Sequence, residues 1–591
     1  MKNAVKIVVF LCLTVCVLLL AVSCNSVPKD PVETTSGNET TSGNETTAVT
    51  TPDETTPEAT TPEETTPEVT TPEVTTPEET TPEVTTPEET TPEVTTPEET
   101  TPEATTPEVT TPEEPPYKMP EKVDLDGYVY RAYVRSNASV IDFGNDGNPA
   151  FYCEDFWVNP AQGEPEDVLE YAVYHRNQQI ERDYNVKIVQ VPQTINMVQE
   201  LARYYQSGDK FDLTIILAKS AAGAATQNLL TELNSLPGLN LSHEAYDPNA
   251  IEELSISGKL YYLSGDMNIS TLDSVSSTVV NMDMYEDYAD AIVDEFDGDE
   301  LYGNIYNVVK SGKWTIDTML KIAEIASVDV DTSDGVLGVS EYDTVGYYQY
   351  NISAVNYFYG AGGRITQMND EGNPEFVIGN DKNGDVFDYI FDKLHPVNRN
   401  VRYPNGFSPD RKRLFVTNAN TLFTDMSLWD VRKDLYVNAT FDYGLLPSPT
   451  YQEGDDYNSV VYFYNTVHLW AIPDYCYDLE KAQLMMDVMA AYSNLKREGS
   501  TMDAYYTRTL SFTLAPDPEA REVMDIIKNS TVYDIGLLYN WSSWETELSE
   551  LWYKRNTNNH GSLVLYLPDA QIQLEETIEK FKNPENPVYP E

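Results

Sequence analysis

Side chains that could carry out catalysis are plentiful in this sequence, but none stands in a pattern that selects a reaction. The five histidines are scattered, and His243-Glu244 lacks the second histidine of a zinc-binding helix. Neither a G-x-S-x-G turn nor a G-x-x-x-x-G-K-[ST] phosphate loop occurs. Carboxylates are numerous enough for a glycosidase pair, yet no spacing singles one out. The acidic loop at 294–300 lacks EF-hand spacing. We therefore expect no enzyme activity, no cofactor and no metal site.

Aromatic side chains are the compositional anomaly, and they favour binding over catalysis. The chain has 41 Tyr and 7 Trp, nearly all after residue 118. Each presents a flat apolar face and a polar tip, which suits amphipathic ligands such as sugars, although many must also serve the core. The net charge of −60 disfavours nucleic acid and anionic lipid surfaces as partners. The composition thus predicts a small-molecule ligand and no nucleic-acid partner.

The first residues have the features of an export signal that ends in a lipid-modified cysteine. Lys2 and Lys6 precede an apolar run at 8–22, which is only marginally long enough for a membrane-spanning helix. Residues 21–24 (AVSC) resemble the lipobox of bacterial lipoproteins, with alanine in place of the usual leucine. This pattern predicts a signal peptide at 1–24 and lipidation of Cys24. An ordinary signal peptide or a retained anchor is the alternative.

A proline-rich repeat follows and is expected to be a disordered linker over residues 25–118. The unit TTPE recurs from about residue 50 to 114, with proline at every fifth position. Proline at that density forbids a helix, and so few apolar residues cannot offset the entropy of ordering. In the polyproline II conformation the repeat would reach at most about 200 Å. It reads as a tether between the lipid and the folded part, or as a glycosylated stalk or ligand for another domain.

The remaining residues alternate between strand-like and helix-like patterns. Strands are predicted at 126–135, 186–191, 211–217, 258–263, 275–282, 414–423, 443–446 and 460–472. Helices are predicted at 167–183, 195–205, 221–233, 314–326 and 479–492, and the last hundred residues are mainly helical. Strand–helix alternation indicates a parallel sheet covered on both faces. Cys153 and Cys476 are the two cysteines of this part, and whether they pair stays open.

The order of motifs resembles the carbohydrate-type family of extracellular solute-binding proteins of ABC importers, which includes maltose-binding protein. The motifs are AVYHRNQQIERDYNVKI (172–188), FDLTII (211–216), LLTELNSL (229–236), GKLYYL (258–263), VVNMDMYEDY (279–288), SGKWTIDTMLKIAE (311–324), NYFYGAGGRI (356–365), LFTDMSLWDVRKDL (422–435), FDYGLLPSP (441–449) and HLWAIPDYCYDLEKAQLMMDVMAAYS (468–493). Together they cover most of residues 125–545. Their order, more than any single motif, carries the resemblance.

The resemblance implies an α/β fold of the two-lobed periplasmic-binding-protein type (type II), with a hinge and an interlobe cleft. Residues 119–275 and 413–450 are expected to form the first lobe, and residues 276–412 and 451–591 the second. Ligand would bind beyond the carboxyl ends of the parallel strands, where open α/β sheets place their sites. Binding would shift an open state toward a closed one that a membrane permease recognises.

The same resemblance implies which residues contact ligand. Trp429 matches the position where sugar-binding relatives stack an aromatic ring on the ligand, and Asp425 lies just before it. The second-lobe aromatics and the polar groups at strand ends complete the expected set: Tyr347, Tyr348, Tyr350, Asp266, Asn268 and Lys219. Each could equally be a core or a solvated surface residue.

The resulting hypothesis is a monomeric lipoprotein on the outer face of the cell membrane. It would capture a sugar or oligosaccharide and deliver it to an ABC permease. A surface glycan-binding adhesion lipoprotein without transport is one alternative, because the tether is longer than an importer needs. An exported glycoside hydrolase is the other, since Thr/Pro-rich linkers also join catalytic to binding modules.

Overall fold

The computed structural model describes residues 118–135, 155–193, 197–330, 343–349, 353–394, 401–402, 412–417, 419–462, 467–510, 518–544, 547–548 and 564–583. The chain forms two units, residues 1–109 and 110–591, and every described residue belongs to the second. Cys24, the repeat segment and the apolar run at 8–22 lie outside the described residues, as do Cys153 and Tyr350. In the part that is described, no helix is long and apolar enough to cross a membrane.

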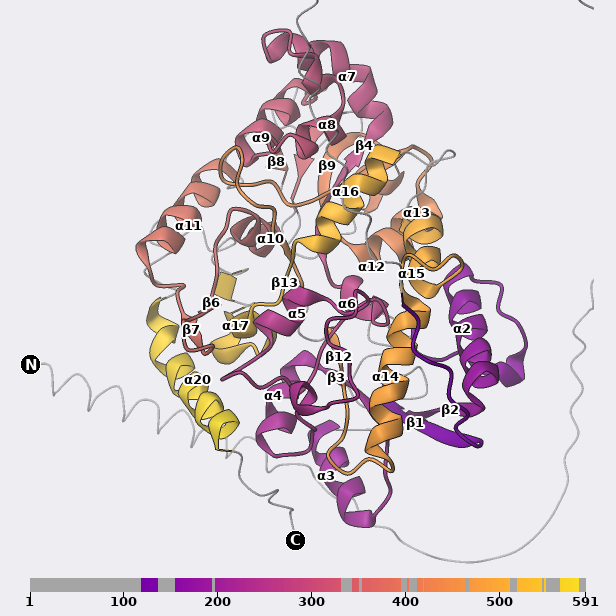
Figure 1. Ribbon diagram of the computed structural model, residues 1–591. Coiled ribbons are helices and arrows are strands. Elements are labelled where there is room, and N and C mark those ends of the chain that lie inside the picture. Colours follow the sequence, from indigo (N-terminus) through magenta and orange to yellow (C-terminus); the bar gives the residue numbers. More distant parts are fainter. Residues whose placement is uncertain are drawn as a thin grey trace, which may run out of the picture. The chain divides into compact units, whose positions relative to one another are not determined.

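The first sheet is built mainly from the beginning of the folded part. It contains β1 (Tyr128–Val134), β2 (Val186–Pro192), β3 (Leu213–Leu217) and β12 (His468–Ala471) in the order β12-β3-β1-β2. Strand β1 runs parallel to β2 and β3, whereas β12 is antiparallel to β3. Helices α2 (Val168–Tyr184), α3 (Met197–Ser207), α4 (Ala218–Thr226) and α14 (Leu479–Ser493) surround it (Figure 1). The predicted strand–helix alternation is confirmed here.

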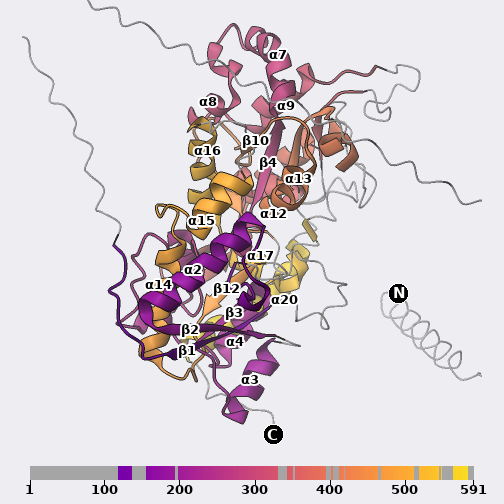
Figure 2. The same cartoon turned by 90° about the vertical axis from the view of Figure 1, so that its right-hand side faces the viewer.

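The second sheet comes from the middle of the chain. It contains β4 (Ser276–Asn281), β5 (Val345–Tyr348), β8 (Val401–Arg402), β9 (Thr421–Ser427) and β10 (Tyr443–Leu446) in the order β10-β4-β9-β5-β8. Helices α7 (Met282–Glu295), α8 (Ile305–Lys310) and α9 (Ile316–Ile325) lie around it, in the upper part of Figures 1 and 2. The described residues thus form a mixed α/β fold with two separate larger sheets, as expected. We call the elements around the first sheet the first half and those around the second sheet the second half.

The helix boundaries follow from local capping chemistry. Asp167 accepts hydrogen bonds from the backbone N–H groups of Leu169 and Glu170 at the start of α2. Thr315 caps α9 and Asp478 caps α14 in the same way. Such side chains satisfy N–H groups that have no partner within the helix, so they determine where it begins. The predicted helices at 167–183, 314–326 and 479–492 are confirmed to within a few residues.

The other described elements are short or lie late in the chain. The helices are α5 (Pro248–Glu253), α6 (Ile269–Leu272), α10 (Ser353–Gly360), α11 (Asp381–Leu394), α12 (Leu428–Asp430), α13 (Tyr436–Asn438), α15 (Thr501–Ala504), α16 (Pro518–Asn529), α17 (Ile535–Leu538) and α20 (Leu567–Lys582). The strands are β6 (Thr366–Met368) with β7 (Pro374–Phe376), and β11 (Ser459–Val460) with β13 (Thr531–Val532).

Three stretches of chain lie side by side between the two sheets, and we call them the crossing segments: 274–275, 459–461 and 530–532. The first leads from α6 to β4, and the second leads from β10 back to β12. The third follows α16, which packs on β10 and α8 of the second half. Val275 pairs with Val461, and β11 pairs with β13 in parallel. The halves are therefore joined by a narrow, hydrogen-bonded strip of backbone, which has the form of a hinge.

The strand pairings correct the expected division into lobes. Residues 413–450 were expected in the first lobe, but β9 and β10 pair with β4 and therefore belong to the second half. Residues 451–591 were expected in the second lobe, but β12 pairs with β3 and α14 packs on α2 in the first half. Strand β9 is central in its sheet and is buried along its whole length. A strand that is buried on both faces lacks the one-sided alternation that would show which sheet it joins.

Four local expectations also differ from the structure. The strand predicted at 414–423 begins at Thr421, after a π-helical stretch at Lys412–Thr417. The long strand predicted at 460–472 is two strands, β11 and β12, because this stretch crosses from one half to the other. Residues 258–263 form no described strand, although Leu263 pairs with Trp470 of β12. The helix predicted at 221–233 is α4, which begins directly after β3.

Candidate ligand-binding site

The short helix α6 is the platform of the candidate site. It stands just before the first crossing segment, and all four of its residues are buried. The loop that leads into α6 requires a glycine at position 265, since a Cβ at Gly265 would lie 2.2 Å from the carbonyl oxygen of Ala245. At its end, the N–H of Asp273 donates to the carbonyl of Ile269 at 2.8 Å. Side chains from both halves attach to this one turn.

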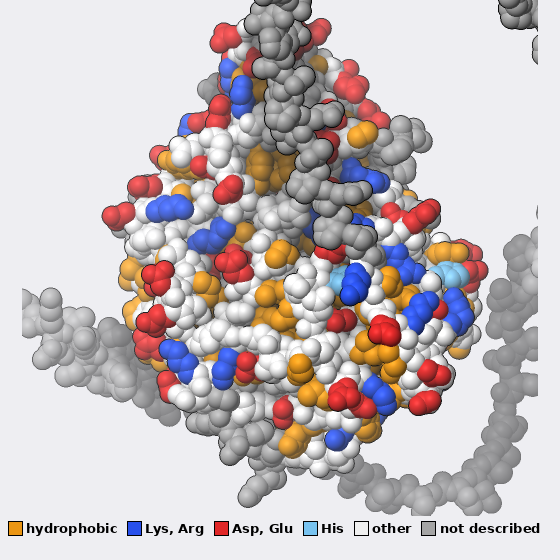
Figure 3. Space-filling view, in the orientation of Figure 1, with side chains coloured by type: hydrophobic (Ala, Val, Ile, Leu, Met, Phe, Trp, Pro, Cys, Tyr) orange, Lys and Arg blue, Asp and Glu red, His pale blue; other side chains and the backbone are white. Residues whose placement is uncertain are grey.

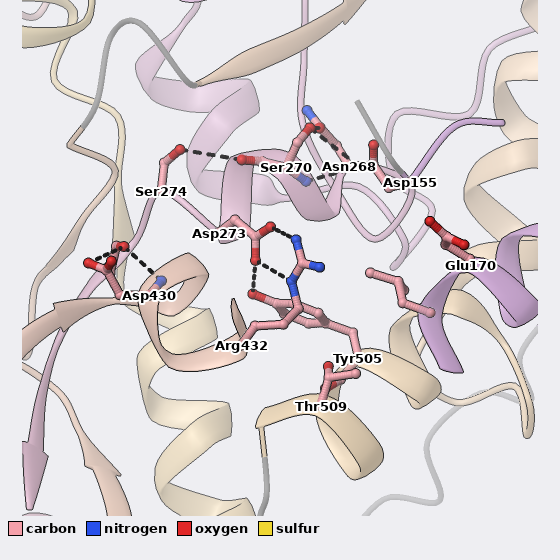
Figure 4. A network of polar contacts seen from close by, with 12 residues as sticks. Asp155, Glu170, Asn268, Ser270, Asp273, Ser274, Asp430, Arg432, Tyr505 and Thr509 are labelled. Atoms are coloured by element: carbon pink, nitrogen blue, oxygen red, sulfur yellow. Dashed lines mark hydrogen bonds and ion pairs between the residues drawn. The ribbon is translucent and has the colours of Figure 1, made fainter. Parts of the chain in front are cut away.

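A buried ion pair joins α6 to the second half (Figure 4). The guanidinium of Arg432 forms an ion pair with the carboxylate of Asp273, and their side chains are 7% and 8% exposed. The hydroxyl of Tyr505 donates to the same carboxylate at 2.8 Å. Burial and the charge of Asp273 raise the pKa of Tyr505, so the phenol stays protonated. Buried charges are tolerated when they are paired and hydrogen-bonded in this way.

Trp429 lies where the second half meets α6. It is the middle residue of α12, which Ser427 caps at the end of β9. Its backbone N–H donates to the carbonyl of Asp273 at 3.0 Å, and the N–H of Leu428 donates to Val275. The side chain is half-buried, and its indole N–H has no hydrogen-bond partner among the described residues. A ring held in this way offers both an aromatic face and a donor to a ligand.

Asp155 reaches α6 from the first half, and the side chain is 2% exposed. One carboxylate oxygen, Oδ2, accepts from the backbone N–H of Ser270 at 2.9 Å. The other oxygen, Oδ1, is buried and has no hydrogen-bond partner among the described residues. Burial raises the pKa of Asp155 to about 6, against the opposing effects of the Ser270 hydrogen bond and the charge of Arg176. Figure 4 shows Asp155 beside Asn268 and Ser270.

Asp425 and Tyr347 are brought together, but in the interior. Asp425 is fully buried on β9. Its carboxylate accepts hydrogen bonds from five side chains, those of Thr278, Tyr347, Ser353, Asn356 and Tyr357. Burial raises the pKa of Asp425, and these hydrogen bonds partly oppose the rise. Tyr347 and Tyr348 are also buried. These residues hold the beginning of α10 against the sheet. Their packing favours a role in the protein interior over the expected contact with ligand.

The predicted polar residues at strand ends are placed in different surroundings. Asp266 is buried and forms an ion pair with Lys528 of α16 at 2.7 Å. It lines a cavity of about 260 Å³ between the first half and α16. Asn268 is also buried, and its amide donates to Thr271 and to the carbonyl of His468. Lys219 is exposed in the first turn of α4. Among the predicted residues that the structure describes, Trp429 alone is partly exposed and bonded to the end of α6.

Four residues of this site were not predicted: Asp155, Asp273, Arg432 and Tyr505. Arg432 follows Trp429 at a helical spacing of three, which is the one local signal that pointed to it. The others lie far from Trp429 in sequence and have no periodic pattern around them. Beyond α6, a cavity of about 770 Å³ lies in the second half between the end of α10, α11 and residues 451–458. No metal-ligating cluster occurs among the residues described here.

The described surface is mixed in charge rather than uniformly acidic. Figure 3 shows acidic side chains interspersed with lysine and arginine on the face that it presents. Ion pairs account for part of this pattern, among them Lys496–Glu244 and Lys393–Asp317. We find no described patch of basic side chains that would suit a nucleic acid.

No protein-family model matches this sequence, and no curated protein does. Similar solved structures share low sequence identity with it. A cyclo/maltodextrin-binding protein complexed with maltotetraose is 14% identical, with a TM-score of 0.45, over 78% of this chain and 99% of the other. An ABC substrate-binding protein from Listeria monocytogenes in complex with cycloalternan is 13% identical, with a TM-score of 0.42, over 77% and 100%. The galacto-N-biose/lacto-N-biose I-binding protein from Bifidobacterium longum is 11% identical, with a TM-score of 0.43, over 78% and 99%.

Proposed function

We propose that this protein is the ligand-capturing component of an ABC importer and that it binds a sugar or oligosaccharide without chemically altering it. The observation that carries the proposal is the set of crossing segments. Val275, β11 and β13 form a narrow hydrogen-bonded strip between two halves that each contain a sheet. Such a strip permits one half to rotate against the other around a ligand.

The position of Trp429 supports a saccharide as the ligand. The residue belongs to the second half, yet its backbone is bonded to Asp273 at the end of α6. Its half-buried indole can stack on the apolar face of a sugar ring. Asp155 and Ser270 supply polar groups on the other half, next to the same turn. A mostly preformed pocket with a few placed polar groups is the usual form of a small-molecule site.

Membrane attachment is the second part of the proposal. Residues 21–24 match the pattern at which a lipoprotein signal is removed, and Cys24 would then carry the lipid. The repeat segment after it would hold the folded part away from the bilayer while a permease in the same membrane receives the ligand. Mass spectrometry of the mature N-terminus tests this step: a diacylated Cys24 is expected, and an unprocessed Met1 would contradict it.

Titration calorimetry against a ligand panel tests the capture function. The panel contains neutral oligosaccharides such as maltotetraose and lacto-N-biose, with spermidine and dipeptides as non-sugar probes. We expect heat with at least one saccharide and a more compact particle by small-angle scattering once it is bound. Binding of spermidine or a dipeptide in place of every saccharide would overturn the ligand class. Release of reducing sugar from a polysaccharide would favour a hydrolase instead.

One observation favours a surface adhesion module as the second candidate. The repeat segment would extend to about 200 Å, which exceeds what delivery to a permease in the same membrane requires. Pull-down of this protein with detergent-solubilised permease components separates the two. Capture of a transporter in the presence of saccharide supports delivery, whereas attachment of cells to immobilised glycan without such capture supports adhesion.

A further inference from the structure

Asp155 has a buried carboxylate oxygen, Oδ1, that accepts no hydrogen bond from the described residues. Its side chain is 2% exposed, and Oδ1 has no hydrogen-bond partner among the described residues. The backbone N–H and the hydroxyl of Ser270 both contact Oδ2 instead, at 2.9 and 3.4 Å. Leaving a buried polar atom without a partner costs free energy, and more so when the group carries charge. Such an atom is free to accept a hydrogen bond from a ligand.

Trp429 has the opposite need, because its buried indole N–H has no acceptor among the described residues. Its indole Nε1 is sealed from solvent although the residue as a whole is half-buried. Its backbone is held in place by the hydrogen bond to Asp273 and by the Ser427 cap of its helix. An indole N–H can only donate, so its occupant must supply an acceptor.

Both groups are attached to the same turn of helix but belong to different halves. Asp155 contacts Ser270 near the beginning of α6, and Trp429 contacts Asp273 at its end. These attachment points are three residues apart, which is about 4.5 Å along a helix. Phe156, the residue after Asp155, packs on Trp470 of the first sheet, whereas Trp429 follows β9 of the second sheet. The two groups therefore approach α6 from different halves, just before the crossing segment at 274–275.

We propose that Asp155 and Trp429 are the two poles of one binding site for a polyhydroxyl ligand, in which Oδ1 accepts a ligand hydroxyl proton and the indole N–H donates to a ligand oxygen. This inference rests on the proposed function and names the residues and the chemistry of its site. A hydroxyl group is both donor and acceptor, so adjacent hydroxyls on one ring satisfy both poles. Because the poles lie on different halves, the ligand holds the halves together.

The neighbouring charges favour a neutral ligand over a charged one. The carboxylate of Asp273 is already neutralised by Arg432, and Arg176 faces Asp155 from α2. A ligand carboxylate would be repelled by Asp155, and it offers no donor to Oδ1. A polyamine would satisfy Asp155 but offers no acceptor to the indole N–H. A neutral saccharide meets both requirements without bringing an unpaired charge into a buried site.

Binding requires the halves to separate first. In the arrangement described here, both unpartnered atoms are closed off from solvent. Rotation about the crossing segments would move Trp429 away from Asp155, since they are carried by opposite halves. The ligand would then enter, and closure would place it between them.

The test compares saccharide affinity in matched variants of the full-length protein by titration calorimetry with maltotetraose and the neutral oligosaccharide panel. Asp155→Asn keeps the shape and removes the charge, and Trp429→Phe keeps an aromatic ring and removes the N–H. Asp487→Asn is the control for the carboxylate, because Asp487 is buried and accepts hydrogen bonds from Tyr246 and Asn240. Trp544→Phe is the control for the indole, because the buried N–H of Trp544 likewise has no partner among the described residues. We expect each test variant to bind at least tenfold more weakly and each control to stay within twofold of the wild type.

A measurement on the unaltered protein supplements these variants in case Asp155→Asn does not fold. A ligand hydroxyl that donates to Oδ1 stabilises the charged form, so protonation of Asp155 must oppose binding. Its pKa is about 6, with Arg176 of α2, Asp273 and the Ser270 N–H of α6 as the groups that face it. Affinity should therefore fall about tenfold from pH 7 to pH 5.

The outcomes separate this inference from the function on which it rests. In one outcome the wild type binds saccharide, and Asp155→Asn and Trp429→Phe bind it as tightly as their controls do. That result would overturn the two-pole site and leave the capture function intact. A flat affinity profile between pH 5 and pH 7 would overturn the role of Asp155 alone. Wild-type protein that binds no saccharide of the panel would overturn both.

Discussion

The backbone N–H of Trp429, in the second half, donates to the carbonyl oxygen of Asp273 at 3.0 Å. Asp273 ends the turn of α6 that precedes the crossing segment at 274–275. The carboxylate of the same Asp273 is paired with Arg432, three residues after Trp429. Asp273 thus holds α12 through its backbone and the following π-helical turn, Val431–Leu435, through its side chain. We therefore expect a substitution of Trp429 to affect the crossing segment at 274–275.

Trp429→Ala should weaken saccharide binding by about 1–3 kcal/mol, because it removes an aromatic stacking surface at the centre of the candidate site. Calorimetry measures the change. Tyr171→Ala is the control, since Tyr171 is an aromatic residue of α2 that is 45% exposed and packs on His175 of the same helix. An equal affinity for wild type and Trp429→Ala would remove the residue from the site.

Arg432→Ala should destabilise the fold by about 3–5 kcal/mol, because it leaves the carboxylate of Asp273 buried without its partner. The double variant Arg432→Ala with Asp273→Ala should cost less than the sum of the two single changes, since it removes both charges. Urea unfolding, monitored by tryptophan fluorescence, gives the three free energies. Strictly additive values would show that the two side chains do not interact energetically.

The pH dependence of stability should report the burial of Asp155. Its pKa is about 6 in the folded state, against an ordinary value of 3.8, so the folded protein holds this proton more tightly than the unfolded chain. The stability that this provides is fully present below pH 3.8 and is lost as pH rises through about 6. The difference between wild type and Asp155→Asn should therefore change by about 2 kcal/mol between pH 4 and pH 6.5. A constant difference would contradict the raised pKa.

Gly265→Ala should destabilise the protein by about 1–3 kcal/mol, because the added Cβ would lie 2.2 Å from the carbonyl oxygen of Ala245 and the approach to α6 would have to shift. Gly303→Ala is the matched control, since its nearest neighbour would be a methyl group of Val293 at an ordinary 3.5 Å. Thermal unfolding measures both. Equal melting temperatures for the two variants would show that the loop relaxes without cost.

The sequence predicted elements well where local patterns determine them. Strand β3 and helix α14 were located to within two residues, since an apolar run bounded by polar residues and an Asp-capped amphipathic stretch are local signals. The partners of strands were predicted poorly. Strand β9 is buried on both faces, so its sequence has no alternation that would show which sheet it enters.

The candidate site was predicted only in part, for a related reason. Trp429 could be found because it stands in a recognisable run of motifs. Asp425 stood in the same run, yet the structure shows its carboxylate turned inward to five donors. Asp155 could not be found, because its importance depends on a bond to Ser270 that spans 115 residues and on an oxygen that the fold leaves without a partner. Such properties exist only after the chain has folded.

The placement of β12 has a consequence for biogenesis. The first sheet begins with β1 at Tyr128 but is completed only when His468–Ala471 pairs with β3, some 250 residues after β3 has left the ribosome. Until then β3 offers an open edge, and long-range pairing of this kind is slow. The first sheet of the nascent chain therefore stays incomplete until most of the folded part has been synthesised. A C-terminal truncation before residue 468 would therefore leave two incomplete halves rather than one functional lobe.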